Sequence, residues 1–375
     1  MKLVIVQPWF TAFGHPAQST LNTARVLGER KDVLYLIEDP RGKPEFAGMA
    51  AKLESFSPVR TFRTFGDSLA VRTLFASIAL MRKRKDLPER IFFLDASLLA
   101  LSIIWPLFRL FLPRIRFVSM LYLHGPEGVM ANSVKRYFVR RFLSQPEVRL
   151  YLRTEELASC WRTEFSQVPA SRIDTIPSLE IPEGPPPRMK KAGVKERHFG
   201  LVGQIRPGKS IEWLAPLFSS NANLGKLLIA GQYFPGKEGD LENVLKDFPS
   251  FTNQFLSEQE MIRLAALQDY LVMLYDNWDV RMEAATLFVA ARAGVPVLVY
   301  DEGWCGRMVR EYGCGVGVPR TPRPGKEFFA SLPDRDSDAY KAMLDGIGRF
   351  REAFSGQRIR NIFIFKAGLS ESRPL

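Results

Sequence analysis

The sequence predicts an α/β fold in which short apolar strands alternate with helices in two domains. The clearest unit is residues 271–300, where the apolar runs LVMLY and VPVLVY flank MEAATLFVAARA, a segment of strong helix formers closed by Gly294. Two parallel strands joined by a right-handed helical crossover are expected there. The same alternation recurs along most of the chain and stops at the Pro-rich segment 182–193.

The composition is that of a globular protein with about two domains, since 46% of the 375 residues are apolar and 25% are charged. Three histidines, and three cysteines without metal-ligand spacing, argue against a zinc site. The cysteine usage favours a reducing, cytoplasmic compartment. The longest uncharged apolar stretch, residues 96–108, has 13 residues, which is too few to span a bilayer.

In the first half, apolar runs of strand length alternate with segments of helical spacing. Strands are predicted at residues 2–6, 33–37, 91–95, 116–124 and 148–154, and helices at 19–30, 72–85, 96–112, 132–143 and 154–165. Pro106 is expected to interrupt its helix, and residues 40–70 are expected to be irregular. The first strand, a loop with Gly14 and a helix predict a Rossmann-type unit without the G-x-G-x-x-G motif.

The second half repeats the alternation. Strands are predicted at residues 198–204, 226–231, 271–275 and 295–300, and helices at 258–267, 306–313 and 337–355. The domains are therefore expected at residues 1–187 and 188–350. The amphipathic tail, residues 351–375, is expected to pack back on the first domain.

The net charge of +12 is unevenly distributed, with eight basic and two acidic side chains in residues 96–150. This suggests an anionic partner, either lipid, a phosphate-bearing substrate or nucleic acid, although a basic solvated surface is the simpler interpretation. No helix-turn-helix or RNA-binding signal is present, so nucleic acid is not expected. The apolar segment 96–112 and the basic segment 132–143 favour peripheral docking on the inner face of the cell membrane. Candidate acceptor or membrane contacts are Lys135, Arg136, Arg140 and Arg141.

A polar loop, YDNWDVR, precedes the helix of the 271–300 unit. Free N–H groups and the helix dipole favour an anion at a helix N-terminus, and the small residues Ala284 and Ala285 would let a phosphate approach the backbone. In the loop after the strand 198–204, Arg206 and Lys209 add fixed positive charge. These features predict a site for the diphosphate of a nucleotide-sugar.

Five short motifs resemble those of GT-B glycosyltransferases: LHG (123–125), GLVGQIRPGKSIEWL (200–214), LLIAG (227–231), AARAGVPVLV (290–299) and GCGVGV (313–318). The second half resembles family 4 and related retaining, nucleotide-sugar-dependent enzymes. The resemblance implies a GT-B fold, in which two Rossmann-like, doubly wound α/β domains face each other across a cleft. It also implies a glycosyltransferase of the hexosyltransferase class.

The resemblance also implies individual donor contacts. Lys209 matches a lysine that contacts the donor diphosphate, in the loop that begins at Gly203. The family's arginine position holds Gln204, and Arg206 is expected to substitute for it. His124 matches a histidine close to the donor sugar, where it would hydrogen-bond the sugar or stabilise charge at the anomeric centre.

Gly14 matches the family's glycine loop near the donor phosphate or the acceptor. The family's two glutamates, eight residues apart, are absent, because Arg281 and Val289 occupy their positions and Glu283 is displaced from the pattern. Arg281 either binds phosphate directly or forms a salt bridge beside the helix. Glu283 either contacts the donor or stabilises the helix dipole.

The expected function is transfer of a sugar from a nucleotide-sugar donor to a lipid-linked or polysaccharide acceptor. Cationic side chains and helix N–H groups would stabilise the leaving diphosphate, so neither a metal nor a cofactor is expected. Retention of anomeric configuration follows from the resemblance alone. A non-catalytic binding protein on the same fold is the alternative, because the glutamate pair is missing.

Overall fold

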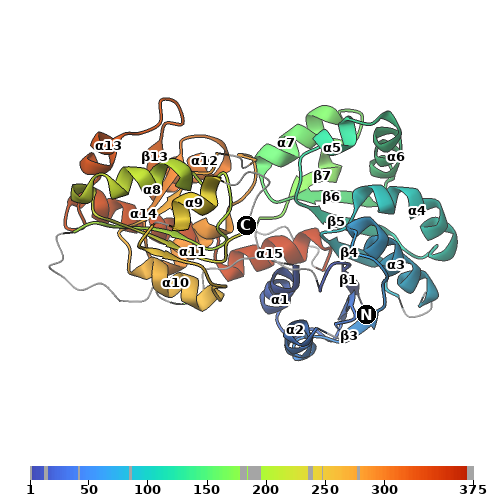
Figure 1. Cartoon of the computed structure of the whole chain (residues 1–375). Helices are drawn as coiled ribbons and strands as arrows, with labels where there is room; N and C mark the ends of the chain where they lie inside the picture. The colour runs from blue at the N-terminus through green and yellow to red at the C-terminus, as the bar shows by residue number, and fades with distance from the viewer. Residues whose placement is uncertain are drawn as a thin grey trace. The chain divides into compact units, whose positions relative to one another are not determined.

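A computed structural model describes residues 2–11, 16–40, 43–83, 87–177, 184, 196–234, 240–246, 248–276 and 279–369. The chain forms two compact units: Met1–Glu180 with Gly356–Leu375, and Ile181–Ser355. Each unit contains one parallel sheet with helices packed on it, as Figure 1 shows. The predicted glycine-loop residue Gly14 lies outside the described residues, as does most of the Pro-rich segment.

The described part of the first unit has a seven-stranded sheet in the order β3-β2-β1-β4-β5-β6-β7, with every pair parallel. The interior strand β1 is buried along its whole length, which explains its apolar run. The strands are β1 (Leu3–Gln7), β2 (Val33–Glu38), β3 (Val59–Phe62), β4 (Arg90–Leu94), β5 (Phe117–Tyr122), β6 (Val148–Leu152) and β7 (Ile173–Thr175).

Helices lie on both sides of this sheet, with α1 and α15 on one side and α3 and α4 on the other (Figure 1). Ser68, Ser97, Asn132 and Thr154 cap helices by accepting an N–H bond three residues on. The helices are α1 (Pro16–Leu27), α2 (Pro44–Glu54), α3 (Leu69–Arg82), α4 (Leu98–Phe111), α5 (Glu127–Met130), α6 (Ser133–Leu143), α7 (Glu155–Glu164) and α15 (Gly356–Lys366).

The last helix, α15, belongs to the first unit although the whole second unit precedes it in the chain. Phe363 is fully buried and its ring lies 5.0 Å from that of Phe92 on β4. Lys366 forms an ion pair with Asp174 at 2.7 Å, and its carbonyl oxygen accepts a bond from the Tyr151 hydroxyl at 3.1 Å. The tail is therefore part of the core of this unit.

Two local predictions were wrong. Residues 40–70 contain α2 and β3, and Pro44 stands in the first turn of α2, where its missing N–H costs nothing. Pro106 does not interrupt α4, which continues to Phe111. Pro106 lies on the exposed side of the helix, so the carbonyl that loses its partner can turn to water.

The described part of the second unit has a six-stranded parallel sheet in the order β10-β9-β8-β11-β12-β13. Alternate residues of β11 enter different cores: Tyr270 and Val272 pack on one face, and Leu271 and Met273 on the other. The strands are β8 (His198–Val202), β9 (Lys226–Ala230), β10 (Phe251–Thr252), β11 (Tyr270–Met273), β12 (Val297–Tyr300) and β13 (Gly315–Val318). The helices are α8 (Ile211–Ser219), α9 (Asp240–Lys246), α10 (Glu258–Ala266), α11 (Ala285–Ala293), α12 (Gly303–Tyr312), α13 (Lys326–Ser331) and α14 (Asp338–Ala353). The predicted pair of Rossmann-like α/β units is confirmed.

Gly231, which follows β9, has φ +151°, and a Cβ added there would lie 1.6 Å from the carbonyl oxygen of Gly203. We expect Gly231→Ala to lower the free energy of unfolding by on the order of 2–4 kcal/mol, because the backbone must move. Gly348, on the exposed side of α14, has open space around it, so Gly348→Ala should raise that free energy by about 0.5–1 kcal/mol. Chemical denaturation measures both, and effects of the same sign would contradict this account.

Candidate functional site

In the second unit the order of the strands reverses between β8 and β11, with β9 and β10 on one side and β12 and β13 on the other. Ligands of open parallel sheets bind at the carboxyl ends of the strands beside such a switch point. The loops after β8 and β11 touch there, since the N–H of Asp276 donates to the carbonyl of Gly208 at 2.7 Å. These two loops form the candidate site.

The loop after β8 is bent by left-handed backbone at three positions: Gly203 (φ +103°), Gly208 (φ +84°) and Ser210 (φ +58°). Glycine adopts this conformation freely, whereas serine is strained in it. Ser210 is nevertheless fully buried and directly precedes α8, with its hydroxyl turned away from the helix N–H groups. The bends carry Lys209 inward, so its side chain does not extend into solvent.

Lys209 is only 7% exposed, although lysine is normally a surface residue. Its Nζ lies 5.2 Å from the centre of the Tyr275 ring, and the described residues provide it with no carboxylate partner. Burial and, second, the charge of Arg206 lower the pKa of the Lys209 ammonium to about 7. An anion bound beside these two cations would favour the charged form of Lys209.

A buried polar network holds the two loops together. The Asp276 carboxylate accepts bonds from the hydroxyls of Ser210 (2.9 Å) and Tyr300 (2.8 Å), and those hydroxyls lie 3.1 Å apart. Arg320 donates to the carbonyls of Asp276 (2.9 Å) and Tyr275 (3.2 Å) and stacks on the Tyr300 ring. This network fixes the backbone that positions Lys209.

These partners were not among the predicted site residues. Each stands at or just beyond the carboxyl end of a strand: Asp276 after β11, Tyr300 at the end of β12 and Arg320 after β13. That position is a recognisable signal in a parallel sheet. Their mutual contacts depend on strand order, which the linear sequence does not contain.

The N-terminus of α11 lies at the end of the loop after β11. Ala284 is the capping residue, is 2% exposed and has no side chain to accept an N–H bond, and the helix begins at Ala285. The Tyr275 hydroxyl donates to the Thr286 hydroxyl at 3.1 Å, which ties the first turn to the ring beside Lys209. The backbone N–H groups of this turn are therefore the kind that bind anions. Glu283, just before the cap, is partly exposed.

Arg281 is engaged by its neighbour. Its Nε and terminal nitrogen each donate to one carboxylate oxygen of Asp279 at 2.8 Å, in a two-pronged ion pair. Both side chains are about one quarter exposed. Direct binding of phosphate by Arg281 stays a prediction, and it would have to proceed with Asp279 attached to the same guanidinium.

The remaining predicted residues belong to the first unit. His124 follows β5, is exposed and packs edge to face with Tyr122 at 5.7 Å. Its carbonyl accepts a bond from the Trp161 indole N–H at 2.9 Å, which fixes the backbone of the turn. The structure exposes all four basic candidates on α6, namely Lys135, Arg136, Arg140 and Arg141.

Among the residues that the structure describes, no three His, Cys, Asp or Glu side chains come together as a metal-binding group. The carboxylate of Asp276, the most central acid of the site, is occupied by hydroxyl donors. The cations that bear directly on an anion at Lys209 are therefore Lys209 itself and Arg206.

No family model matches the sequence, and no curated protein matches it significantly. Solved structures do match over nearly the whole chain. HepE from Anabaena, solved with UDP and with UDP-glucose, superposes with a TM-score of 0.67 at 12% and 11% identity, respectively, covering 99% of this chain and 100% of its own. A glycosyltransferase from Rickettsia africae matches with a TM-score of 0.67 at 11% identity, covering 99% of both chains. Sucrose-phosphate synthase from Thermosynechococcus elongatus matches with a TM-score of 0.64 at 14% identity, covering 99% of this chain and 100% of its own. The protein thus has the GT-B fold, as predicted.

Lys209→Met should stabilise the empty protein. The folded-state pKa of Lys209 lies below its unfolded value, so the unfolded chain binds more protons between about pH 7 and pH 10, and the penalty of this lysine shrinks as pH rises through that window. We expect the variant to gain on the order of 1–3 kcal/mol at pH 7 and progressively less toward pH 10. Urea denaturation across this pH range measures the gain, and a gain independent of pH would contradict the pKa.

Tyr300→Phe should loosen the Lys209 loop, because it removes a hydroxyl that donates to Asp276. We expect the Kd for inorganic pyrophosphate to rise about three- to tenfold, measured by calorimetry. Tyr340→Phe is the matched control, since the Tyr340 hydroxyl is also buried but donates to the Asp269 carbonyl at the opposite end of the sheet. Equal loss of affinity in both variants would show that the network is only structural.

Proposed function

We propose that this protein is a glycosyltransferase that moves a sugar from a nucleoside-diphosphate sugar to a lipid-linked or polysaccharide acceptor. The observation that carries the proposal is the buried ammonium of Lys209, beside Arg206 and without a carboxylate partner in the described residues. A buried cation of this kind is unfavourable until an anion binds. A diphosphate at the switch point of the sheet would supply that anion.

The reaction breaks the bond between the anomeric carbon and the diphosphate oxygen, and negative charge develops on the leaving phosphate. Lys209 and Arg206 would stabilise this charge, together with the N–H groups at the start of α11. Because Lys209 titrates near pH 7 in the free protein, it would take up a proton as the diphosphate binds. These groups would suffice for departure without a metal ion.

His124 would contact the donor sugar, as the family resemblance implies. Hydrogen bonding to the sugar, or stabilisation of charge at the anomeric carbon, are the two roles open to an exposed imidazole. Retention of configuration is proposed on the same resemblance. The structural neighbour HepE, solved with UDP-glucose, supports a nucleotide-sugar as the donor class.

A non-catalytic nucleotide-binding protein is the second candidate, favoured by the lost glutamate pair. At the two positions stand Arg281, which is paired with Asp279, and Val289, which is buried on α11. A donor ribose that depends on a carboxylate there would find none. Binding without turnover would be the result expected of this candidate.

We also infer that the protein works at the cytoplasmic face of the cell membrane, where a lipid-linked acceptor would be found. The exposed basic side chains of α6 support this inference. In the described residues, no helix combines the length and the apolar character that crossing a bilayer requires.

Thermal-shift measurements with a panel of nucleoside diphosphates and their sugars test the donor site, because a specific ligand stabilises the fold by mass action.

We expect Lys209→Ala to abolish the shift and to lower kcat/KM for transfer or donor hydrolysis on the order of a hundredfold. Wild-type activity should be retained in excess EDTA. Lys226→Ala is the control, since Lys226 is two-thirds exposed and pairs with Glu196. Loss of activity in EDTA would refute metal independence, and absence of any shift would overturn both candidates.

A further inference from the structure

The solvent side of α4 is apolar. Four large side chains on it are exposed: Ile103 by 53%, Leu107 by 47%, Leu110 by 71% and Phe111 by 41%. Their spacing of four, three and one residues places them along one stripe of the helix. Surface helices of globular proteins normally expose polar residues to water. A contiguous apolar stripe in contact with water is unfavourable and marks a surface that binds something.

The stripe is not a misplaced core face, because the core face of α4 is already buried on the other side. Leu101, Trp105 and Phe108 are less than 9% exposed, and the Trp105 ring packs edge to face on Phe142 of α6 at 5.3 Å. The helix is therefore apolar on both sides. This pattern is typical of a helix that has a second apolar environment besides the protein core.

Basic side chains flank the stripe. The neighbouring helix α6 exposes Lys135, Arg136, Arg140 and Arg141, and Arg114 is exposed just after α4. None of these five has a carboxylate partner in the described residues. Two apolar residues of α6, Val134 and Tyr137, are exposed among them, by 61% and 48%. An apolar stripe surrounded by unpaired positive charge is complementary to a surface with an apolar interior and anionic groups at its boundary with water.

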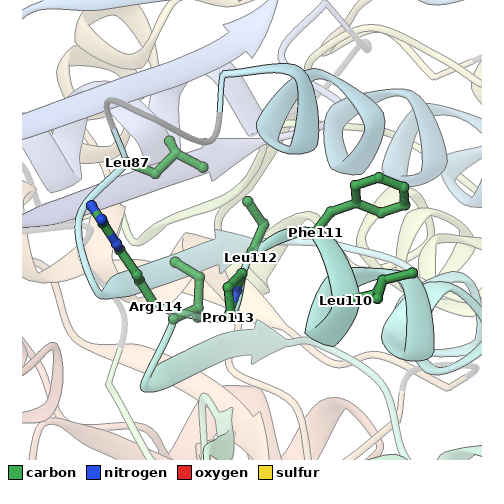
Figure 2. Close-up of a pocket in the computed structure, with 7 residues that line it drawn as sticks. Leu87, Leu110, Phe111, Leu112, Pro113 and Arg114 are labelled. Carbon is green, nitrogen blue, oxygen red and sulfur yellow. The ribbon is translucent and has the colours of Figure 1, made fainter.

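A cavity of about 300 Å³ lies at the end of α4, lined by residues 110–115 and Leu87. Figure 2 shows the Leu87 side chain beside Arg114 and Leu112, with Leu110 and Phe111 on the last turn of the helix. Its lining combines apolar side chains with polar backbone and the Arg114 guanidinium, and would accept the end of an acyl chain beside an anionic headgroup.

We propose that α4 lies in the interface of an anionic phospholipid bilayer, with Ile103, Leu107, Leu110 and Phe111 inserted below the headgroups and the basic face of α6 against them. The helix has 14 residues, or about 21 Å, and so suits lying in the interface. A second copy of the chain would also cover an apolar stripe, but it would bring the same positive charges together. Docking through α4 would bring the protein to a lipid-linked acceptor. The biological purpose of the membrane contact therefore rests on the proposed function, whereas the contact itself does not.

Flotation with phosphatidylcholine vesicles, with and without phosphatidylglycerol, tests the proposal in the full chain. We expect binding only to the anionic vesicles, weakened by salt. Leu107→Ser/Leu110→Ser should lower the partition coefficient about tenfold or more, and Arg136→Gln/Arg140→Gln should remove most of the dependence on salt. Phe255→Ser, which removes a side chain 77% exposed in the second unit, is the matched control and should bind as the wild type does.

Equal binding by the leucine variant and the wild type would overturn the proposal, as would equal losses in the leucine variant and the control. The stripe would instead be assigned to contact with a second copy by a different result. In that case the wild type sediments as a dimer and does not bind vesicles, and the leucine variant sediments as a monomer. The nucleoside-diphosphate thermal shift should be unchanged in all these variants. Failure to dock and failure of the donor site are thereby separated, because vesicle binding requires no donor.

Discussion

A lysine ammonium held away from water, beside another cation and over an aromatic ring, is the constraint on which the second unit depends. In the empty protein this arrangement opposes folding, since burial lowers the pKa of Lys209 to about 7. The fold sustains it because Ser210 adopts a strained backbone conformation. Asp276 adds hydrogen bonds to Ser210, Tyr300, Gly208 and Arg320. Stability is lower locally because this lysine is buried, and an anion bound beside Lys209 would restore it.

The surrounding network ties together the two loops that carry the candidate site. The polar groups of Asp276 and Tyr300 are engaged by each other, by Ser210 and by Arg320. They hold the loops after β8 and β11 in one conformation, as a preorganised anion site would require. The N-terminus of α11 benefits from the same support through the bond from Tyr275 to Thr286.

Local pattern was enough to predict the fold but only part of the site. Apolar runs such as 198–204 and 295–300 correspond to β8 and β12, because strands buried on both faces need no long-range information to be recognised. The prediction of irregular structure at residues 40–70 is wrong because Pro44 stands in the first turn of α2, where proline is compatible with a helix. Lys209 was found by its motif, whereas its burial and its polar neighbours arise from three strands that meet only in the folded sheet. For Arg281 the sequence allows a salt bridge beside the helix but does not identify Asp279 as the partner, because that depends on side-chain geometry.

The path of the chain through its two units has a consequence for biosynthesis. The first unit is discontinuous: it begins at the N-terminus, is left before residue 181 and is completed by α15 after residue 355. Phe363 packs on Phe92, so the chain must be synthesised through α15 before the earliest strands can close their core. The middle unit, encoded as one uninterrupted block, is free to mature first. A nascent chain that has not yet reached α15 would therefore leave the aromatic surface around Phe92 uncovered, where chaperones could bind it.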